Sequence, residues 1–175
     1  EWAQFGGWIS LSALIPLVFL YFKQYNVLSV DAPILLYGKM LLLDTQALFF
    51  KVLFLFSAII YYFYYLAINK DEDDEQIGEY HFMIFSSLLG LNLVVMSSNM
   101  LLAFLSFEVV SIASYSLVLF GANKQRPEAG IKYVIFGAVS TAVMLFGASI
   151  IYALNGSLEF NTLFNTTLVD GEDYT

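Results

Sequence analysis

A single acidic side chain stands inside one of the most apolar stretches of this 175-residue chain. Glu108 lies in MLLAFLSFEVVSIASYSLVLFG, which holds no other charged residue and is long enough to cross a membrane as a helix. Moving a carboxylate into hydrocarbon costs several kcal/mol even on lenient insertion scales. A carboxyl group at this position therefore indicates a site that moves protons or other ions.

Two further polar side chains share a face with Glu108 if this stretch is helical. At about 100° of rotation per residue, Ser111 and Tyr115 follow Glu108 on nearly one stripe. A carboxyl, a hydroxyl and a phenol in a row can hold water molecules through which a proton hops. The alternative is a protonated Glu108 that only forms a hydrogen bond with a neighbouring helix.

Two lysines inside other apolar stretches are the remaining candidates. Lys132 lies about one turn after Pro127 and Lys51 about two turns into its own stretch, so either side chain can extend to the membrane surface as an anchor. With a helical rise of about 1.5 Å per residue, Glu108 and Lys132 differ in depth by roughly 12 Å. We therefore expect no direct ion pair between them unless a helix is unwound or displaced.

Composition indicates that membrane-spanning helices carry these residues. Hydrophobic residues make up 59% of the chain and charged residues 13%, and the mean hydropathy is +0.74. Because about 20 apolar residues cross a bilayer as a helix, we expect an all-α fold, a polytopic transmembrane helix bundle. The expected spans are residues 5–22, 44–68, 80–98, 101–120 and 127–154, followed by an extramembrane tail or loop at 155–175.

The connecting segments give the expected orientation and extent. Pro33 disfavours a helix at Ala32, which predicts a turn or re-entrant loop there, and the acidic run NKDEDDEQIGE predicts a solvated loop. Basic residues are slightly more numerous on the side of the acidic loop, which we therefore expect to be cytoplasmic. The chain opens with Glu1 and not Met, so we expect residues 1–175 to be a single membrane-embedded fragment of a longer protein.

Charge and residue counts exclude several kinds of site. A net charge of −8 argues against a nucleic-acid partner, since phosphates require clustered basic residues. The absence of cysteine excludes a thiolate-held iron–sulfur cluster, and one histidine leaves little to bind a metal. That histidine, His81, opens a span beside Tyr80, where an interfacial position is the simpler interpretation. We expect no cofactor or metal on this chain.

Small residues in the last span predict close helix packing. Gly130, Gly137, Thr141 and Ala148 form a seam along one side, and such seams let helices approach closely in lipid. Lys132 points away from this seam, which predicts protein or a water-filled cavity on its other side. The spans are therefore expected to be part of a larger bundle.

The same stretches resemble a known family. The blocks D-x-x-x-L-F-F-K-V-L-F, G-E-Y, L-x-F-x-x-x-E-x-x-S-x-x-x-Y and E-A-x-x-K-Y-x-x-x-G-A-x-S-x-A occur in order across about residues 38–157. This order is similar to the antiporter-like subunit N of the bacterial respiratory NADH:quinone oxidoreductase, complex I. In that family the subunit has about fourteen helices, with discontinuous helices at mid-membrane as transport folds use them.

The resemblance implies a subunit of a translocase that moves protons through a buried Glu/Lys/water relay in a multi-pass fold of the bacterial inner membrane. Glu108 matches the family's pathway glutamate, Lys132 the lysine of its E-A-x-x-K-Y block, and Lys51 the lysine of F-F-K-V, for which only a supporting role is implied. Ser111 and Tyr115 are further supporting candidates. NADH, FMN, iron–sulfur clusters and quinone would be bound by other subunits, and the partners would be lipid and other membrane-arm subunits.

Two other functions stay open from the sequence. A subunit of a multisubunit Na⁺/H⁺ antiporter or of a membrane hydrogenase would share the fold and the buried acid. A non-conducting scaffold subunit would keep Glu108 neutral and buried.

Overall fold

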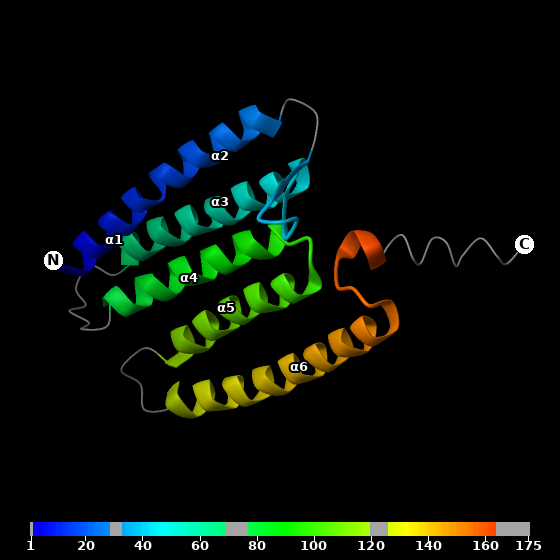
Figure 1. Ribbon diagram of the computed structural model, residues 1–175. Helices are drawn as coiled ribbons and strands as arrows, with labels where there is room; N and C mark the ends of the chain where they lie inside the picture. Colours follow the sequence, from blue (N-terminus) through cyan, green and yellow to red (C-terminus); the bar gives the residue numbers. More distant parts are fainter. Residues whose placement is uncertain (1, 29–32, 69–76, 120–125, 164–175) are drawn as a thin grey trace, which may run out of the picture.

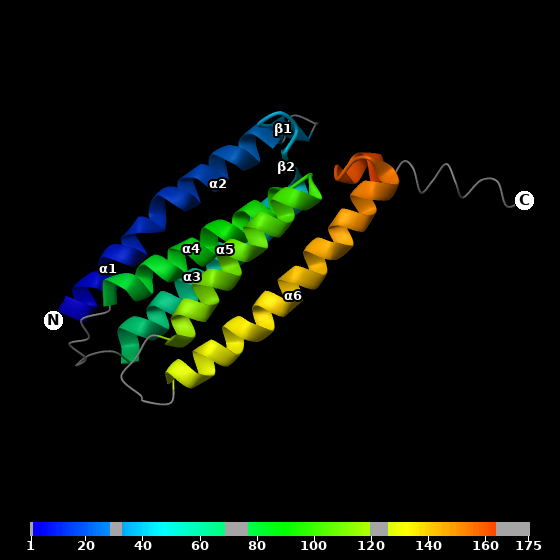
Figure 2. The ribbon, with the colours of Figure 1, turned by 60° about the horizontal axis from the view of Figure 1, so that its bottom comes forward.

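The protein is described by a computed structural model for residues 2–28, 33–68, 77–119 and 126–163. Within these ranges the chain forms helices and one small hairpin: α1 (Trp2–Ala13), α2 (Ile15–Leu28), β1 (Ile34–Leu36), β2 (Leu41–Leu43), α3 (Thr45–Ile68), α4 (Ile77–Met96), α5 (Met100–Leu119) and α6 (Arg126–Asn155). Helices α2 to α6 follow one another in chain order (Figure 1), with α2 and α6 at opposite edges in both views (Figures 1 and 2). The predicted all-α membrane fold is confirmed.

In the described part of the chain, five helical segments are long and apolar enough to cross a membrane. They are Phe5–Leu28, Thr45–Ala67, Gly78–Met96, Met100–Leu119 and Glu128–Asn155. Helix α6 begins at Arg126, so Pro127 stands in its first turn, where a missing N–H costs no helical hydrogen bond.

The first of these segments is interrupted between α1 and α2. Pro16 has no N–H to donate to the carbonyl one turn earlier, and its ring crowds that turn. Leu14 instead donates its N–H to the carbonyl of Leu11 at 3.2 Å, which closes a tighter turn at the junction. The chain is helical on both sides, so α1 and α2 form one span with a break in it.

A hairpin that the sequence did not predict follows α2. Strands β1 and β2 pair antiparallel, and the turn between them holds Tyr37, Gly38 and Lys39 at positive φ values of 49°, 65° and 73°. The turn or re-entrant loop predicted at Ala32 lies outside the described residues. Ser98 donates its backbone N–H to the carbonyl of Met40 at 2.9 Å, so the hairpin is attached to the corner between α4 and α5.

The segment after α6 returns to the start of α5. Met100 donates its N–H to the carbonyl of Leu158 at 2.9 Å, and Phe160 donates to the carbonyl of Ser98 at 3.0 Å. Backbone pairing therefore holds residues 158–160 of the predicted tail or loop against the bundle. Residues 164–175 lie outside the described part of the chain.

The larger cluster of buried apolar side chains lies on the α2–α3–α4 side. Its core consists of Leu14, Tyr21, Leu48, Leu55, Ala58, Tyr62 and Leu88. Only 6% of the residues in the most apolar part of α6 are buried, compared with 33% in the most apolar part of α3. The apolar surface of α6 is therefore left for lipid or for further helices to cover.

Candidate functional site

Glu108 lies in the middle of α5, about 12 Å along the helix from Met100 at 1.5 Å per residue. Its side chain is half-buried, and its Oε1 is fully enclosed without a hydrogen-bond partner among the described residues. An enclosed polar atom of this kind costs free energy unless something pairs with it. The structure therefore places Glu108 within a span, as the sequence predicts, and no described residue donates a hydrogen bond to its Oε1.

Of the two hydroxyl residues beyond Glu108, Tyr115 contacts α6 and Ser111 pairs within α5. The Tyr115 ring packs edge-on against the ring of Tyr133, with centroids 4.7 Å apart and an interplanar angle of 79°. Ser111 offers its backbone carbonyl to the hydroxyl of Ser114 at 2.8 Å. Within the described chain, no direct hydrogen bond joins Glu108 to either Ser111 or Tyr115, so the stripe is a row of neighbours that water would have to connect.

Lys132 pairs with an acid on its own helix. Its Nζ lies 2.5 Å from Oε1 of Glu128, four residues earlier, and the side chains are 66% and 72% exposed. This pair occupies the first two turns of α6, away from Glu108. The expectation that Lys132 makes no direct ion pair with Glu108 is consistent with this geometry.

Lys51 is not the exposed anchor that depth alone suggested. It is 3% exposed, its Nζ donates to Oε1 of Gln24 at 3.2 Å, and it lies 5.7 Å from the centre of the Tyr21 ring. Within the described ranges no carboxylate lies within ion-pair distance of it. Its surroundings are one neutral acceptor and one aromatic face, both supplied by α2.

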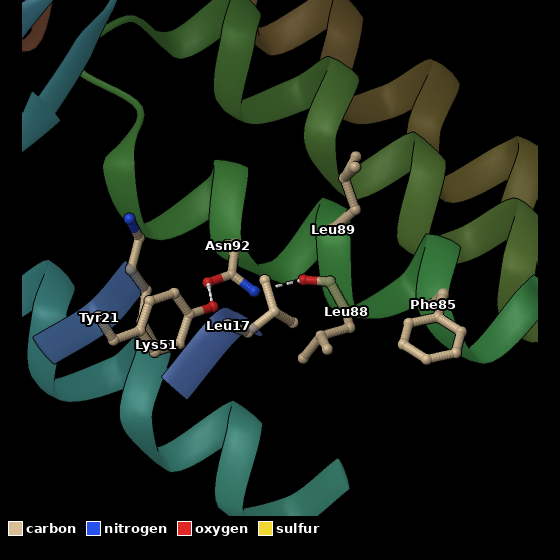
Figure 3. A pocket seen from close by; sticks show the side chains of 7 residues that line it. All are labelled: Leu17, Tyr21, Lys51, Phe85, Leu88, Leu89 and Asn92. Carbon is tan, nitrogen blue, oxygen red and sulfur yellow. Dashed lines mark hydrogen bonds between the residues drawn. The ribbon is translucent and has the colours of Figure 1, made fainter. Parts of the chain in front are cut away.

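A cavity of about 360 Å³ adjoins Lys51 between α2, α3 and α4 (Figure 3). Tyr21 donates its hydroxyl to Oδ1 of Asn92 at 2.5 Å, and Asn92 donates its amide to the carbonyl of Leu88 at 2.6 Å. The remaining lining is apolar: Leu17, Phe85 and Leu89. The sequence did not reveal the pair of Tyr21 and Asn92, because these residues are 71 positions apart and no local pattern predicts their contact.

His81 is buried and not solvated at an interface. It is 6% exposed, and its ring centre lies 5.4 Å from that of Tyr62 and 5.0 Å from that of Tyr65. Neither ring nitrogen has a hydrogen-bond partner among the described residues. Helix α4 and the tyrosines of α3 therefore enclose the ring of His81 near the start of α4.

Metal binding finds no support in the described ranges. They contain no group of three or more histidine, cysteine or acidic side chains close enough to share an ion. The arrangement around Glu108 instead offers a carboxyl, hydroxyls and phenols, which exchange protons.

Two solved respiratory membrane complexes contain a chain with a similar fold. It superposes on a chain of respiratory complex I from Thermus thermophilus with a TM-score of 0.70 at 22% identity, and on a chain of the archaeal membrane-bound sulfane sulfur reductase with a TM-score of 0.71 at 21% identity. Each match covers 90% of this chain and 33% of the other. At these identities the match concerns the fold alone.

The sequence is similar to one described family and to curated membrane subunits. Residues 97–173 match the family described as "NADH:quinone oxidoreductase/Mrp antiporter, TM". NADH-quinone oxidoreductase subunit N 2 of Chloroherpeton thalassium is 42% identical over 118 residues, 65% of this chain and 23% of the relative. Subunit N of Chlorobium chlorochromatii is 29% identical over 94% of this chain and 32% of the relative. The chain is thus a relative of NADH-quinone oxidoreductase subunit N, and spans a quarter to a third of those relatives.

Proposed function

We propose that this chain is part of a proton-translocating membrane-arm subunit of an NADH:quinone oxidoreductase, and that Glu108 takes up and releases the proton. One observation supports this most directly. Glu108 lies mid-span in α5 with an enclosed Oε1 that has no described partner. A carboxyl group kept in a membrane at this cost is typical of proton pathways.

The relay consists of side chains that exchange protons with bound water. Glu108 is the central group, Ser111 and Tyr115 extend it along α5, and Lys132 supplies a positive charge near the membrane surface. When a lysine is close, its charge stabilises the ionised form of Glu108, and when the lysine moves or loses its proton, Glu108 binds one. Lys51 is a supporting residue whose charge acts from the α2–α3–α4 side. Each turnover then alternates charge between acid and base.

The redox chemistry belongs to other subunits under this proposal. NADH, FMN, iron–sulfur clusters and quinone would be bound elsewhere in the complex, and the partners would be the other membrane-arm subunits in a bacterial inner membrane. A relative in Methanosarcina mazei supports this division: it is the F(420)H(2) dehydrogenase subunit N, 27% identical over 86% of this chain. Similar membrane subunits thus occur in complexes named for different electron donors.

The test is Glu108→Gln in the full-length subunit within its assembled complex. Glutamine keeps the size of the side chain but cannot carry a proton, so proton pumping per electron should fall, and turnover should fall where the two are tightly coupled. Glu159→Gln, at an exposed acid after α6, is the matched control. Wild-type pumping in an assembled Glu108→Gln complex would refute the proposal.

A second candidate is supported by the matched family itself, whose description includes antiporters. A subunit of a multisubunit Na⁺/H⁺ antiporter or membrane hydrogenase would use the same acid. Genes for flavin and iron–sulfur subunits beside this one favour the respiratory complex, and small membrane subunits alone favour the antiporter.

A further inference from the structure

The phenol of Tyr133 on α6 lies beside the hydroxyl groups in the half of α5 that ends at Leu119. Ser114 Oγ lies 3.4 Å from the hydroxyl oxygen of Tyr133 and 2.8 Å from the carbonyl oxygen of Ser111. Ser114 has a single hydroxyl hydrogen, so it cannot donate to both at once. Either that hydrogen moves between the two acceptors, or Tyr133 donates its own. Both arrangements allow a proton to pass between α6 and α5.

Gly137 determines where the phenol of Tyr115 lies. A Cβ atom built on Gly137 would stand 1.7 Å from the hydroxyl oxygen of Tyr115 and 2.4 Å from its Cζ. The phenol therefore occupies the space that any side chain at position 137 would fill. Because helical side chains lean toward the N-terminus of their helix, this hydroxyl lies nearer the level of Glu108 than the Tyr115 backbone does.

The rings of Tyr115 and Tyr133 are in direct contact, so phenols of α5 and α6 lie side by side across the helix pair. Their rings meet edge-on with centroids 4.7 Å apart. Tyr133 is 44% exposed and lies about 10 Å along α6 from Arg126, at a rise of 1.5 Å per residue. Tyr133 therefore stands between the enclosed Glu108 carboxyl and the membrane surface at the Arg126 end of α6.

We propose that Tyr133 is a further proton-carrying residue of the Glu108 pathway, and that Gly137 is a positioning residue that admits the Tyr115 phenol. The inference rests on the proposed function of Glu108. In each transfer Tyr133 gives its hydroxyl hydrogen to Ser114 Oγ and takes another from water on its exposed side, while Ser114 gives its own hydrogen to a water molecule that passes one of its hydrogens to Glu108. Every oxygen gains one hydrogen and loses one, so the row is unchanged after a transfer.

The test uses the full-length subunit in its assembled complex, reconstituted into liposomes and driven by NADH and a quinone. Tyr133→Phe removes only the hydroxyl, and Gly137→Ala forces the Tyr115 phenol out of its place. We expect each to lower proton pumping by on the order of tenfold, less than the loss typical of an acid–base group because water can partly bypass a hydroxyl.

Matched controls lie on the same helix. Tyr152→Phe changes a tyrosine that is 56% exposed, and Gly147→Ala adds a methyl group where no other atom lies within 4 Å. Both should pump at the wild-type rate. Equal losses in the controls and in the Tyr133→Phe and Gly137→Ala complexes would overturn the inference, since the effect would then follow from any change to α6.

A double variant separates positioning from packing. If Gly137 acts through the Tyr115 hydroxyl, Gly137→Ala should lower pumping no further in a Tyr115→Phe background, whereas an additional loss would overturn its positioning role. Should Gly137→Ala prevent assembly, Tyr133→Phe decides, because it keeps the ring contact.

The failure of this inference is distinguishable from failure of the proposed function. Normal pumping by Tyr133→Phe together with defective pumping by Glu108→Gln overturns the role of Tyr133 alone. Normal pumping by both overturns the pathway.

Discussion

Helices α4 and α5 approach closely at Gly90, which makes this glycine a sensitive probe of how the Glu108 helix is held. A Cβ atom at position 90 would lie 2.7 Å from Cγ2 of Val110, 3.0 Å from the carbonyl oxygen of Ser106 and 3.2 Å from the backbone nitrogen of Val110. Two of these atoms belong to backbone and cannot rotate away. Reaching the 3.4 Å at which ordinary contact begins requires the α5 backbone to move by about 0.4 Å at Ser106, and Cγ2 of Val110 to move by about 0.7 Å.

Gly90→Ala should therefore lower stability in spite of the better helix propensity of alanine. Overpacking costs about 1–3 kcal/mol, and the backbone contacts place this case near the upper end. The propensity gain is about 1 kcal/mol. The expected net loss is thus about 2 kcal/mol, while Gly147→Ala, which meets no atom within 4 Å, should gain up to about 1 kcal/mol.

The assay is heat-induced loss of folded full-length subunit from its detergent-solubilised complex, followed by size-exclusion chromatography. Gly90→Ala should be lost at a lower temperature than wild type and Gly147→Ala at the same or a higher one. Val110→Ala added to Gly90→Ala should restore part of the loss, because it removes the 2.7 Å contact and leaves the two backbone contacts. Equal stability of the Gly90→Ala and Gly147→Ala complexes would refute the reasoning.

Three further predictions concern buried or capping polar groups, each measured by the same thermal assay. Asp44→Ala removes the carboxylate that accepts the Ala47 N–H at 2.6 Å at the start of α3, and should cost about 1 kcal/mol. Tyr21→Phe leaves Oδ1 of Asn92 without its donor, and should cost about 1–2 kcal/mol. Lys51→Met should not lower stability, because it replaces a buried charge with an apolar chain of similar size, but should lower pumping if Lys51 supports the relay. Lys23→Met, at an exposed position on α2, should change neither.

The hydrophobic pattern was sufficient to predict the helices but not what lies between them. A run of uncharged residues fixes a span because the bilayer requires backbone hydrogen bonds to close within each segment. The hairpin turn at Tyr37 and Lys39 could not be predicted, since non-glycine residues with positive φ give no composition signal. Its position depends instead on the contact with Ser98, which is remote in sequence.

The candidate site also contains residues that the sequence predicted and residues whose surroundings it could not predict. Glu108 could be found from the sequence because a charge inside a span is conspicuous against its apolar neighbours. The burial of Lys51 by Tyr21 and Gln24 could not, since its depth along α3 is compatible with either an exposed or an enclosed ammonium. Tyr133 was passed over because an aromatic residue near a span end is ordinary in a membrane protein.

The attachment of α5 at one end gives that helix the mechanics of a lever. Backbone hydrogen bonds fix Ser98 to Met40 and Met100 to Leu158, so the fulcrum lies at the hairpin end. A tilt of about 5° about this point would shift the backbone of Glu108 by about 1 Å and that of Tyr115 by about 2 Å, at 1.5 Å of rise per residue. A push by a neighbouring subunit on the Leu119 end of α5 would thus reach Glu108 reduced to about two-fifths, and would move Tyr115 about twice as far as the acid.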